Sequence, residues 1–159
     1  MNAQQEFDDR IAKVRQAMRG QGLQTLLVFD AGRHNFLRMN YVAYLTDFIG
    51  VGPETGLVLP LEDAPVLYLA PVWDIPRAKE ESSSSDVRPF NELWNRLAKL
   101  SGKTGLVGRE AMHVDLYDEL VKTLKQTPVN AKDIVENMAR CKGAFDLERL
   151  RKAAEIADA

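Results

Sequence analysis

The sequence contains few of the residues that most often hold metal ions or act as nucleophiles. Its 159 residues include a single cysteine, Cys141, and two histidines, His34 and His113. One cysteine cannot form an intrachain disulfide, and a catalytic zinc site typically needs three protein ligands. Asp and Glu are plentiful, but they show no ordered metal-binding spacing. We therefore expect neither a disulfide nor a metal site in this chain.

The sequence also lacks an excess of charge of one sign and any long apolar run. It has 21 basic and 23 acidic residues, which give a formal net charge of −2. Nucleic-acid-binding domains usually show a basic excess on one face, and a helix that crosses a bilayer needs about 20 apolar residues. The first residues are polar and acidic, unlike a secretory signal peptide. We expect a cytoplasmic protein that binds neither nucleic acid nor membrane.

What the sequence does contain is typical of one globular domain. Hydrophobic residues make up 45% of the chain and charged residues 28%, and a domain of this length buries roughly 70% of the surface of its unfolded chain. Apolar residues recur at steps of three and four from Glu6 to Gly20, which predicts an amphipathic helix. The run from Thr25 to Asp30 is typical of a strand covered by helices on both faces. A helix followed by a buried strand indicates an α/β fold.

The rest of the chain continues this alternation of strands and helices. Two short apolar runs on either side of Pro60 to Ala64 predict a hairpin, and Asp115 is the expected N-cap of a later helix. We predict a three-layer α/β domain with a mixed sheet of five or six strands and helices on both faces. Further strands are expected at about residues 56–59, 65–70, 104–108 and 129–131, and further helices at about 74–81, 93–100, 115–124, 131–140 and from 144 to the last residue.

The segment from Ala31 to Gly56 has no clear periodicity and is rich in aromatic and polar side chains. Irregular segments between regular elements often carry binding residues. The simpler interpretations are solvation for the histidine, a surface position for the arginine and packing for the tyrosines. The candidates for contact with a ligand are His34, Arg38, Tyr44 and Asp47.

Four stretches of the sequence share their order and spacing with a known family. Asn40 to Phe48 is similar to an asparagine-x-x-tyrosine-leucine-threonine-glycine-phenylalanine signature, and Arg140 and Lys142 fit an arginine-x-lysine-serine pattern that introduces a helix. The other two stretches are residues 10–28 and residues 103–108 with the helix after them. Together they resemble the N-terminal domain of the creatinase, prolidase and aminopeptidase P family, the pita-bread metallopeptidases.

The sequence departs from the family pattern at two places. Asp47 stands where the family usually has glycine, which alters the backbone freedom or adds a carboxylate beside the substrate path. Gly143 replaces the serine and Asp146 the glutamate of a capping box. A glycine N-cap loses only a few tenths of a kcal/mol against serine, so we expect the helix to begin there all the same.

The resemblance implies a division of the chain near residue 142. Residues 1–142 would form the family's N-terminal domain, and residues 143–159 would begin a helix that leads into a catalytic domain beyond Ala159. In the family, that second domain holds two divalent metal ions, manganese or a similar ion, which activate water for hydrolysis. We therefore expect no catalytic residue and no cofactor in this chain, and no hydrolysis by this chain alone.

The resemblance also implies a role for the N-terminal domain, which helps to close the substrate groove, often that of the neighbouring subunit in a dimer. The expected partners are its own catalytic domain, a second copy in a homodimer, and a peptide or small-molecule substrate. His34, Arg38, Tyr44 and Asp47 are the substrate-facing candidates, and an Xaa-Pro peptidase of the aminopeptidase P or prolidase type is the simplest parent enzyme.

Other functions fit the sequence as well. The parent enzyme could be a creatinase-like hydrolase that cleaves a small amidine, amide or sulfonium compound. Related domains without catalytic partners serve as protein-interaction modules, so a free-standing module of the same fold is the rival from another class. A small-molecule-binding α/β domain unrelated to the family is a third. The length of the natural reading frame would discriminate among them.

Overall fold

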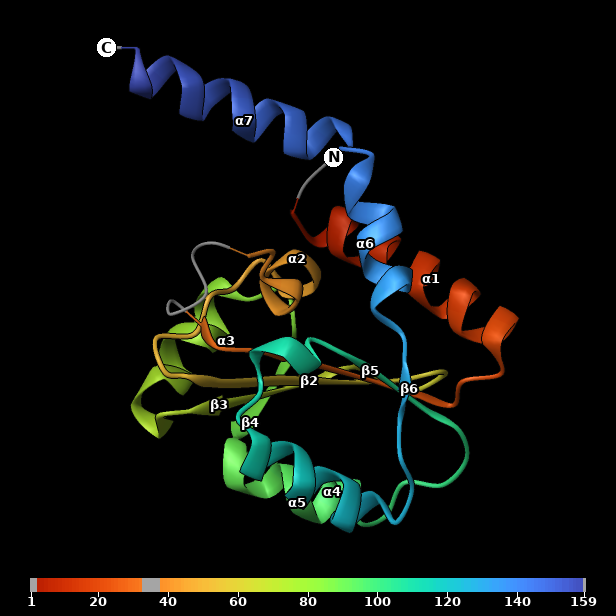
Figure 1. Ribbon diagram of the computed structural model, residues 1–159. Coiled ribbons are helices and arrows are strands. Elements are labelled where there is room, and N and C mark those ends of the chain that lie inside the picture. Colours follow the sequence, from red (N-terminus) through yellow and green to blue (C-terminus); the bar gives the residue numbers. More distant parts are fainter. Residues whose placement is uncertain (1–2, 33–37, 159) are drawn as a thin grey trace.

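One mixed β-sheet of six strands forms the centre of the computed structural model, which describes residues 3–32 and 38–158 (Figure 1). The strands are β1 (Thr25–Asp30), β2 (Glu54–Pro60), β3 (Val66–Ala70), β4 (Asp86–Pro89), β5 (Thr104–Val107) and β6 (Val129–Asn130). Their spatial order is β4-β3-β2-β1-β5-β6. Strand β2 runs antiparallel to both of its neighbours, and the other neighbouring pairs are parallel.

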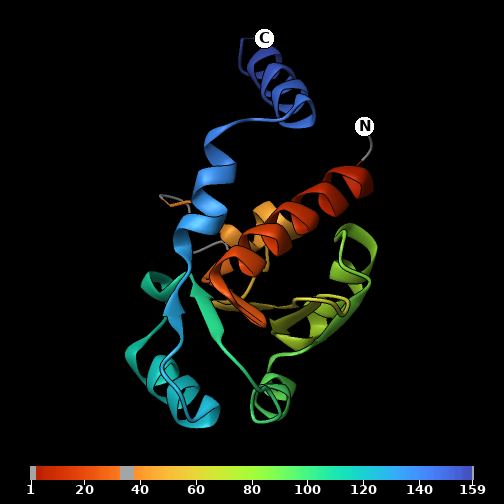
Figure 2. The same cartoon turned by 90° about the vertical axis from the view of Figure 1, so that its right-hand side faces the viewer.

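Helices cover both faces of this sheet. The α-helices of the described residues are α1 (Ala3–Gln21), α2 (Tyr41–Thr46), α3 (Ile75–Glu81), α4 (Leu93–Leu97), α5 (Val114–Leu124), α6 (Lys132–Arg140) and α7 (Ala144–Ala157), with 3-10 turns η2 (Val72–Asp74), η3 (Phe90–Glu92) and η4 (Arg109–Ala111). Helices α1, α2 and α6 lie on one face, and α4 and α5 lie on the other (Figures 1 and 2). The predicted three-layer α/β domain is confirmed.

Strand β1 shows why the sheet needs both helical layers. All six of its residues are buried. Leu26 and Val28 join the core under α1, α2 and α6, and Leu27 and Phe29 join the core above α4 and α5. Because side chains alternate between the faces of a strand, a strand that is apolar at every position must be covered on both sides. The apolar run in the sequence therefore predicts a layer of helices on each face of the sheet.

Most of the predicted elements are present, and the differences are short elements. The hairpin is β2 and β3, and β6 is the predicted edge strand. Strand β4 was not predicted, because its four residues carry a single buried apolar side chain, Val87, and end in Pro89. The prediction of Asp115 as N-cap is wrong by two positions, since the N-cap of α5 is His113.

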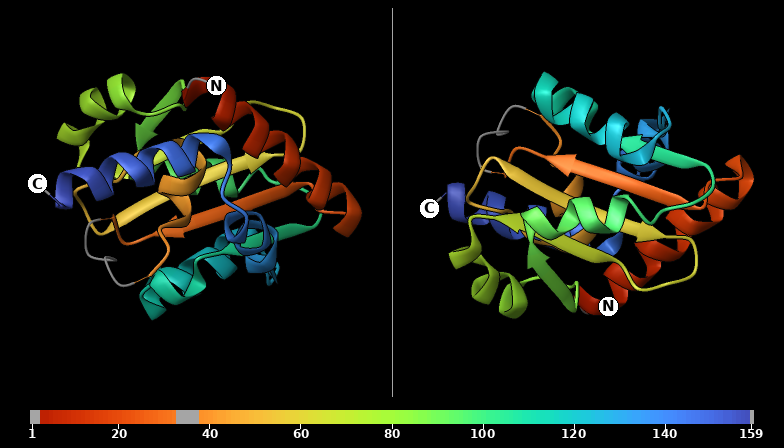
Figure 3. Two further views of the ribbon diagram at one scale, coloured as in Figure 1. Left: turned by 90° about the horizontal axis from the view of Figure 1, so that it is seen from above. Right: turned by 90° about the horizontal axis from the view of Figure 1, so that it is seen from below.

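Helix α7 projects away from the rest of the domain (Figures 1 and 2). Seen from above, it passes over α2 (Figure 3). None of its described residues is buried, and Leu150 and Ile156 are 54% and 72% exposed. The predicted helix is therefore present, but its apolar stripe lies in solvent. Within the described ranges, no helix has the length and apolar character that crossing a membrane requires.

Candidate functional site

Helix α2 lies within the segment from Ala31 to Gly56, and a hydrogen bond fixes each of its ends. At its start, the Asn40 side chain accepts a hydrogen bond of 2.7 Å from the Ala43 amide, as a capping residue does. At its end, the Asp47 amide donates to the Ala43 carbonyl at 2.8 Å. Tyr41 and Leu45 point into the core, whereas Tyr44 is only half-buried. The expectation of irregular structure throughout residues 31–56 is therefore wrong for this stretch.

A groove runs between α2, the end of α6 and α7. Its volume is about 540 Å³, within the roughly 300–1,000 Å³ range of small-ligand pockets. Two of the predicted candidates, Tyr44 and Asp47, line it together with residues of α7 that come from the other end of the chain. The other lining residues are Met39, Asn40, Ala139, Lys142, Asp146, Arg149, Leu150 and Ala153.

Arg10 of α1 organises one wall of this groove. Its guanidinium donates to Glu6 at 3.0 Å, to the Tyr44 carbonyl at 2.5 Å and to Asp146 at 2.7 Å. The same guanidinium lies 4.2 Å from the centroid of the Tyr44 ring, a cation–π distance. Burial acts to lower the pKa of Arg10, but Asp146 and Glu6 outweigh burial and raise the pKa overall. Arg10 is therefore a fixed cation that orients the Tyr44 ring.

Tyr44 offers the groove a neutral phenol. Burial raises the pKa of Tyr44, and Arg10 opposes this effect only in part. A protonated phenol can donate a hydrogen bond as well as accept one. Tyr44 thus presents an aromatic face backed by a guanidinium and a protonated hydroxyl.

Asp47 is not a free carboxylate in this structure. It pairs with Arg149 of α7 at 2.5 Å, and the Arg149 guanidinium also lies 5.4 Å from the centroid of the Phe145 ring. Both members of the pair are more than one-third exposed, so the pair adds little to stability. Its geometric effect is to join the end of α2 to α7 across the groove.

The other two candidates do not line the groove. Arg38 is exposed and donates to the Glu110 carbonyl at 3.1 Å. Nearby, the Tyr41 hydroxyl lies 3.0 Å from Glu110 and 2.9 Å from a Glu136 oxygen, and Lys132 pairs with both carboxylates. His34 lies outside the described residues. Arg38 therefore belongs with a separate polar network.

Sequence reasoning missed Arg10 as a residue of the site. Its signal was present, because Arg10 falls at helical spacing within the apolar stripe of Phe7, Ile11 and Val14. A charged residue at a core position needs a partner when it is buried. The sequence does not reveal that this partner is Asp146, which is 136 positions away.

A family model described as the Creatinase/Prolidase N-terminal domain matches residues 10–140. The chain belongs to this family. The match ends at the last residue of α6, before α7 begins. No curated protein sequence matches the chain.

Solved structures with the same fold include proteins described as a prolidase, a dipeptidase and a cytoplasmic peptidase. The chain is 19% identical to the prolidase from Pyrococcus horikoshii OT3, with a TM-score of 0.75. The match covers 94% of this chain and 40% of that one. For the dipeptidase PepE from Mycobacterium ulcerans, the identity is 20%, the TM-score 0.72 and the coverage 92% and 40%. For the N-terminal domain of the cytoplasmic peptidase PepQ from Mycobacterium tuberculosis H37Rv, the identity is 21% and the TM-score 0.63, and the match covers 81% of this chain and 97% of that one. At these identities the likeness is one of fold. The chain spans about 40% of the length of the first two proteins.

The backbone conformation of Asp47 agrees with the glycine of the family pattern. Its φ of 56° lies in the left-handed region, where glycine is the default because it has no Cβ. This is the position at which the family pattern usually has glycine. Aspartate is one of the few other residues that adopt this conformation at moderate cost, so the backbone turn after α2 is retained and a carboxylate is added at the groove.

The metal ions associated with the family do not fit the described part of this domain. Across residues 3–32 and 38–158, no three His, Cys, Asp or Glu side chains gather closely enough to hold a metal ion. What the groove can do is bind and orient, through the Tyr44 ring, the Asp47–Arg149 pair and the apolar side chains of α7.

Proposed function

We propose that this chain is the non-catalytic N-terminal domain of a dinuclear-metal hydrolase that cleaves Xaa-Pro peptides. Its groove between α2 and α7 would form one wall of the substrate path, and the two divalent metal ions would be held by a catalytic domain that follows α7. The single observation that carries this proposal is the position of the groove: the family's α2 motif and the helix that follows the family match line the same space.

The exposed apolar side of α7 supports the proposal that a catalytic domain packs next to this helix. Leu147, Leu150 and Ile156 are 42%, 54% and 72% exposed. Exposed apolar stripes of this kind mark surfaces that another element covers. If the catalytic domain packs on this stripe, the groove lies beside the junction of the two domains, where Tyr44 and Asp47 would meet the substrate.

The groove is tested by substitution in the product of the complete reading frame. Tyr44→Ala should raise KM for Xaa-Pro dipeptides several-fold with little change in kcat, because a wall that binds ground state and transition state alike affects KM alone. Trp94→Ala is the control, since Trp94 is also a partly buried aromatic residue but belongs to α4, at the other face of the sheet, and does not line the groove. Equal kinetic constants for wild type and Tyr44→Ala would contradict the assignment of the groove.

Two rivals are separated from this proposal by the products formed. A creatinase-like parent would release the fragments of a small amidine, amide or sulfonium compound and leave Xaa-Pro dipeptides intact. Mass spectrometry of the reaction mixtures distinguishes the two parents. A free-standing interaction module would cleave none of these compounds.

One observation favours an interaction surface. Val72 and Trp73 of η2 are 62% and 68% exposed, and Ile49 lies close by, because its carbonyl accepts from Arg77 of α3. In a homodimer, the expected occupant of this patch is a second copy; in an interaction module, it is a different protein. Light scattering on Trp73→Glu distinguishes the homodimer from the interaction module, with Asn95→Glu, at an exposed residue, as the control. A homodimer that uses this patch should become monomeric in Trp73→Glu and stay dimeric in Asn95→Glu.

A further inference from the structure

A second hollow lies at the ends of β5 and β6, on the part of the domain opposite β4 in the sheet order. The chain leaves these two parallel neighbours in opposite directions. After β5 it enters η4 and α5 on one face, and after β6 it enters α6 on the other. Diverging connections at the carboxyl ends of neighbouring parallel strands leave a crevice between them, and this is where open α/β sheets bind ligands.

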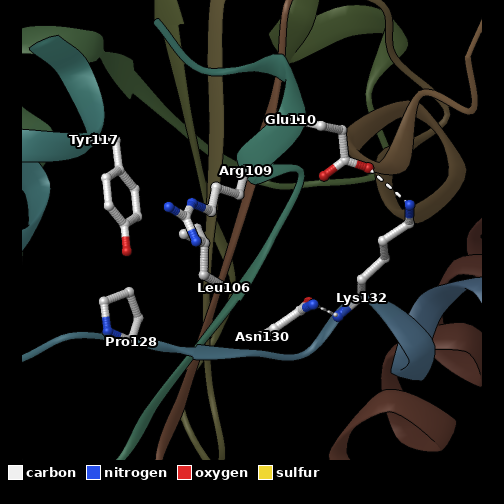
Figure 4. Close-up of a pocket in the computed structure, with 7 residues that line it drawn as sticks. All are labelled: Leu106, Arg109, Glu110, Tyr117, Pro128, Asn130 and Lys132. Carbon is white, nitrogen blue, oxygen red and sulfur yellow. Dashed lines mark hydrogen bonds and ion pairs between the residues drawn. The ribbon is translucent and has the colours of Figure 1, made fainter. Parts of the chain in front are cut away.

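This crevice has the dimensions and walls of a small-ligand pocket (Figure 4). Its volume is about 440 Å³. Leu106 and Pro128 are buried and supply apolar surface, and the ring of Tyr117 stands beside Pro128. The complete lining is Leu106, Arg109, Glu110, Tyr117, Pro128, Asn130 and Lys132.

Two cations lie in the crevice, and they differ in what they are bound to. Lys132 pairs with Glu110 at 3.1 Å and with Glu136 at 3.2 Å, so its charge is compensated. The Arg109 guanidinium lies 4.3 Å from the centroid of the Tyr117 ring. Among the residues that the structure describes, no carboxylate pairs with Arg109. Arg109 is thus an oriented cation, stacked on an aromatic ring, with its hydrogen-bonding edge available.

We propose that this crevice binds a small monocarboxylate that carries a flat ring. The carboxylate would accept two hydrogen bonds from the edge of the Arg109 guanidinium, which matches its geometry, and the ring would lie against Pro128 and Leu106. A single negative charge suits the site. Arg109 supplies one positive charge that no carboxylate of the described residues pairs with, whereas Lys132 is shared by Glu110 and Glu136, so these three groups keep one negative charge that repels a second charge on the ligand.

The first amide of α6 is not the binding group. The Asn130 side chain already accepts a hydrogen bond of 3.1 Å from the Lys132 amide, so this amide has a partner within the chain. The site also differs from the groove between α2 and α7, with which it shares no lining residue.

The test is a titration of the isotope-labelled chain with benzoate, followed by amide NMR. Benzoate should shift the amides of Leu106, Arg109, Tyr117 and Lys132 in a saturable manner. Benzamide has nearly the same shape without the charge and should bind at least roughly tenfold more weakly. Arg109→Gln should weaken benzoate binding by a similar factor, whereas Arg88→Gln, at another exposed arginine, should leave it unchanged.

Several results would overturn the proposal. Equal binding of benzamide and benzoate would remove the role of charge, and unchanged benzoate binding by Arg109→Gln would remove the role of Arg109. Inorganic phosphate that binds as tightly as benzoate would remove the preference for a ring and a single charge. Because Arg109 is exposed, the Arg109→Gln chain should fold as the wild type does, which its amide spectrum reports directly.

Discussion

The guanidinium of Arg10 and the carboxylate of Asp146 meet at 2.7 Å, although the two residues are 136 positions apart in the sequence. Their side chains are 10% and 22% exposed. Arg10 belongs to the first helix of the domain, and Asp146 lies in the first turn of α7. This pair therefore joins α1 to the first turn of α7 and fixes Asp146 at one side of the groove.

Replacing Arg10 should destabilise the domain markedly. Arg10→Met removes the hydrogen bonds to Asp146, Glu6 and the Tyr44 carbonyl and leaves two partly buried carboxylates without their cation. We expect the free energy of unfolding to fall by about 2 kcal/mol. Urea unfolding followed by circular dichroism measures this difference.

The matched control is an arginine whose ion pair is exposed. Arg19 pairs with Glu62 at 2.9 Å, and their side chains are 54% and 74% exposed. Arg19→Met should change the free energy of unfolding by less than about 0.5 kcal/mol. Equal effects of Arg10→Met and Arg19→Met would show that the Arg10 cluster has no special role.

Restoring the glycine of the family pattern should stabilise the domain. Asp47→Gly relieves a left-handed backbone conformation at the end of α2 at the cost of an exposed ion pair, so we expect a gain of about 0.5 kcal/mol. Lys125 ends α5 with a φ of 53° and makes no ion pair among the described residues, so Lys125→Gly should gain about 1 kcal/mol. Thermal unfolding of both variants tests this. A loss of stability in Asp47→Gly alone would mean that the pair with Arg149 outweighs the strain.

The hydrogen bonds of Tyr41 with Glu110 and Glu136 should make the free energy of unfolding depend on pH. Burial alone would raise the pKa of Glu110, but hydrogen bonds, including those from Lys132 and Tyr41, lower it overall. The Tyr41 hydrogen bond is the largest cause of the lowered pKa of Glu136, and Lys132 adds to it. A carboxylate with a lowered pKa stabilises the fold above its unfolded value, about 4.3 for Glu, and this contribution is lost as the pH falls through the folded pKa.

Tyr41→Phe removes the shared hydroxyl and should weaken this dependence. We expect a loss of about 1 kcal/mol in the free energy of unfolding at pH 7 and a smaller loss at pH 3, where a larger share of the carboxylates is protonated. Tyr44→Phe is the control, since its hydroxyl makes no hydrogen bond with these carboxylates. Urea unfolding at the two pH values gives the comparison. An equal loss at both pH values would contradict the role of the carboxylates.

The regular core could be predicted from the sequence because its signals are local. The apolar stripe of α1 and the apolar run of β1 each report burial within a few residues. The six-residue helix α2 is too short to show a full helical repeat, although Asn40 is a recognisable cap. Strand β4 has a single buried apolar residue, Val87, and is likewise below the length at which a period appears.

The site was predictable only in part, because its walls come from distant segments. The position of Tyr44 and Asp47 in the sequence marked them as candidates, and both line the groove. No local pattern connects them with Arg149 or Arg10, which reach them through the packing of α7 and α1. Arg38 is a candidate for the same reason as Tyr44, its place in the segment from Ala31 to Gly56, yet its side chain donates to the Glu110 carbonyl and not into the groove.

The most direct test compares the product of the complete reading frame with residues 1–159 alone, each supplied with Mn²⁺ and an Xaa-Pro dipeptide, with release of proline as the readout. We predict metal-dependent cleavage by the complete product, abolished by a chelator, and no cleavage above background by residues 1–159. Metal-dependent release of proline by residues 1–159, or its absence from the complete product, would contradict the proposal that this domain shapes a groove for chemistry performed elsewhere in the chain.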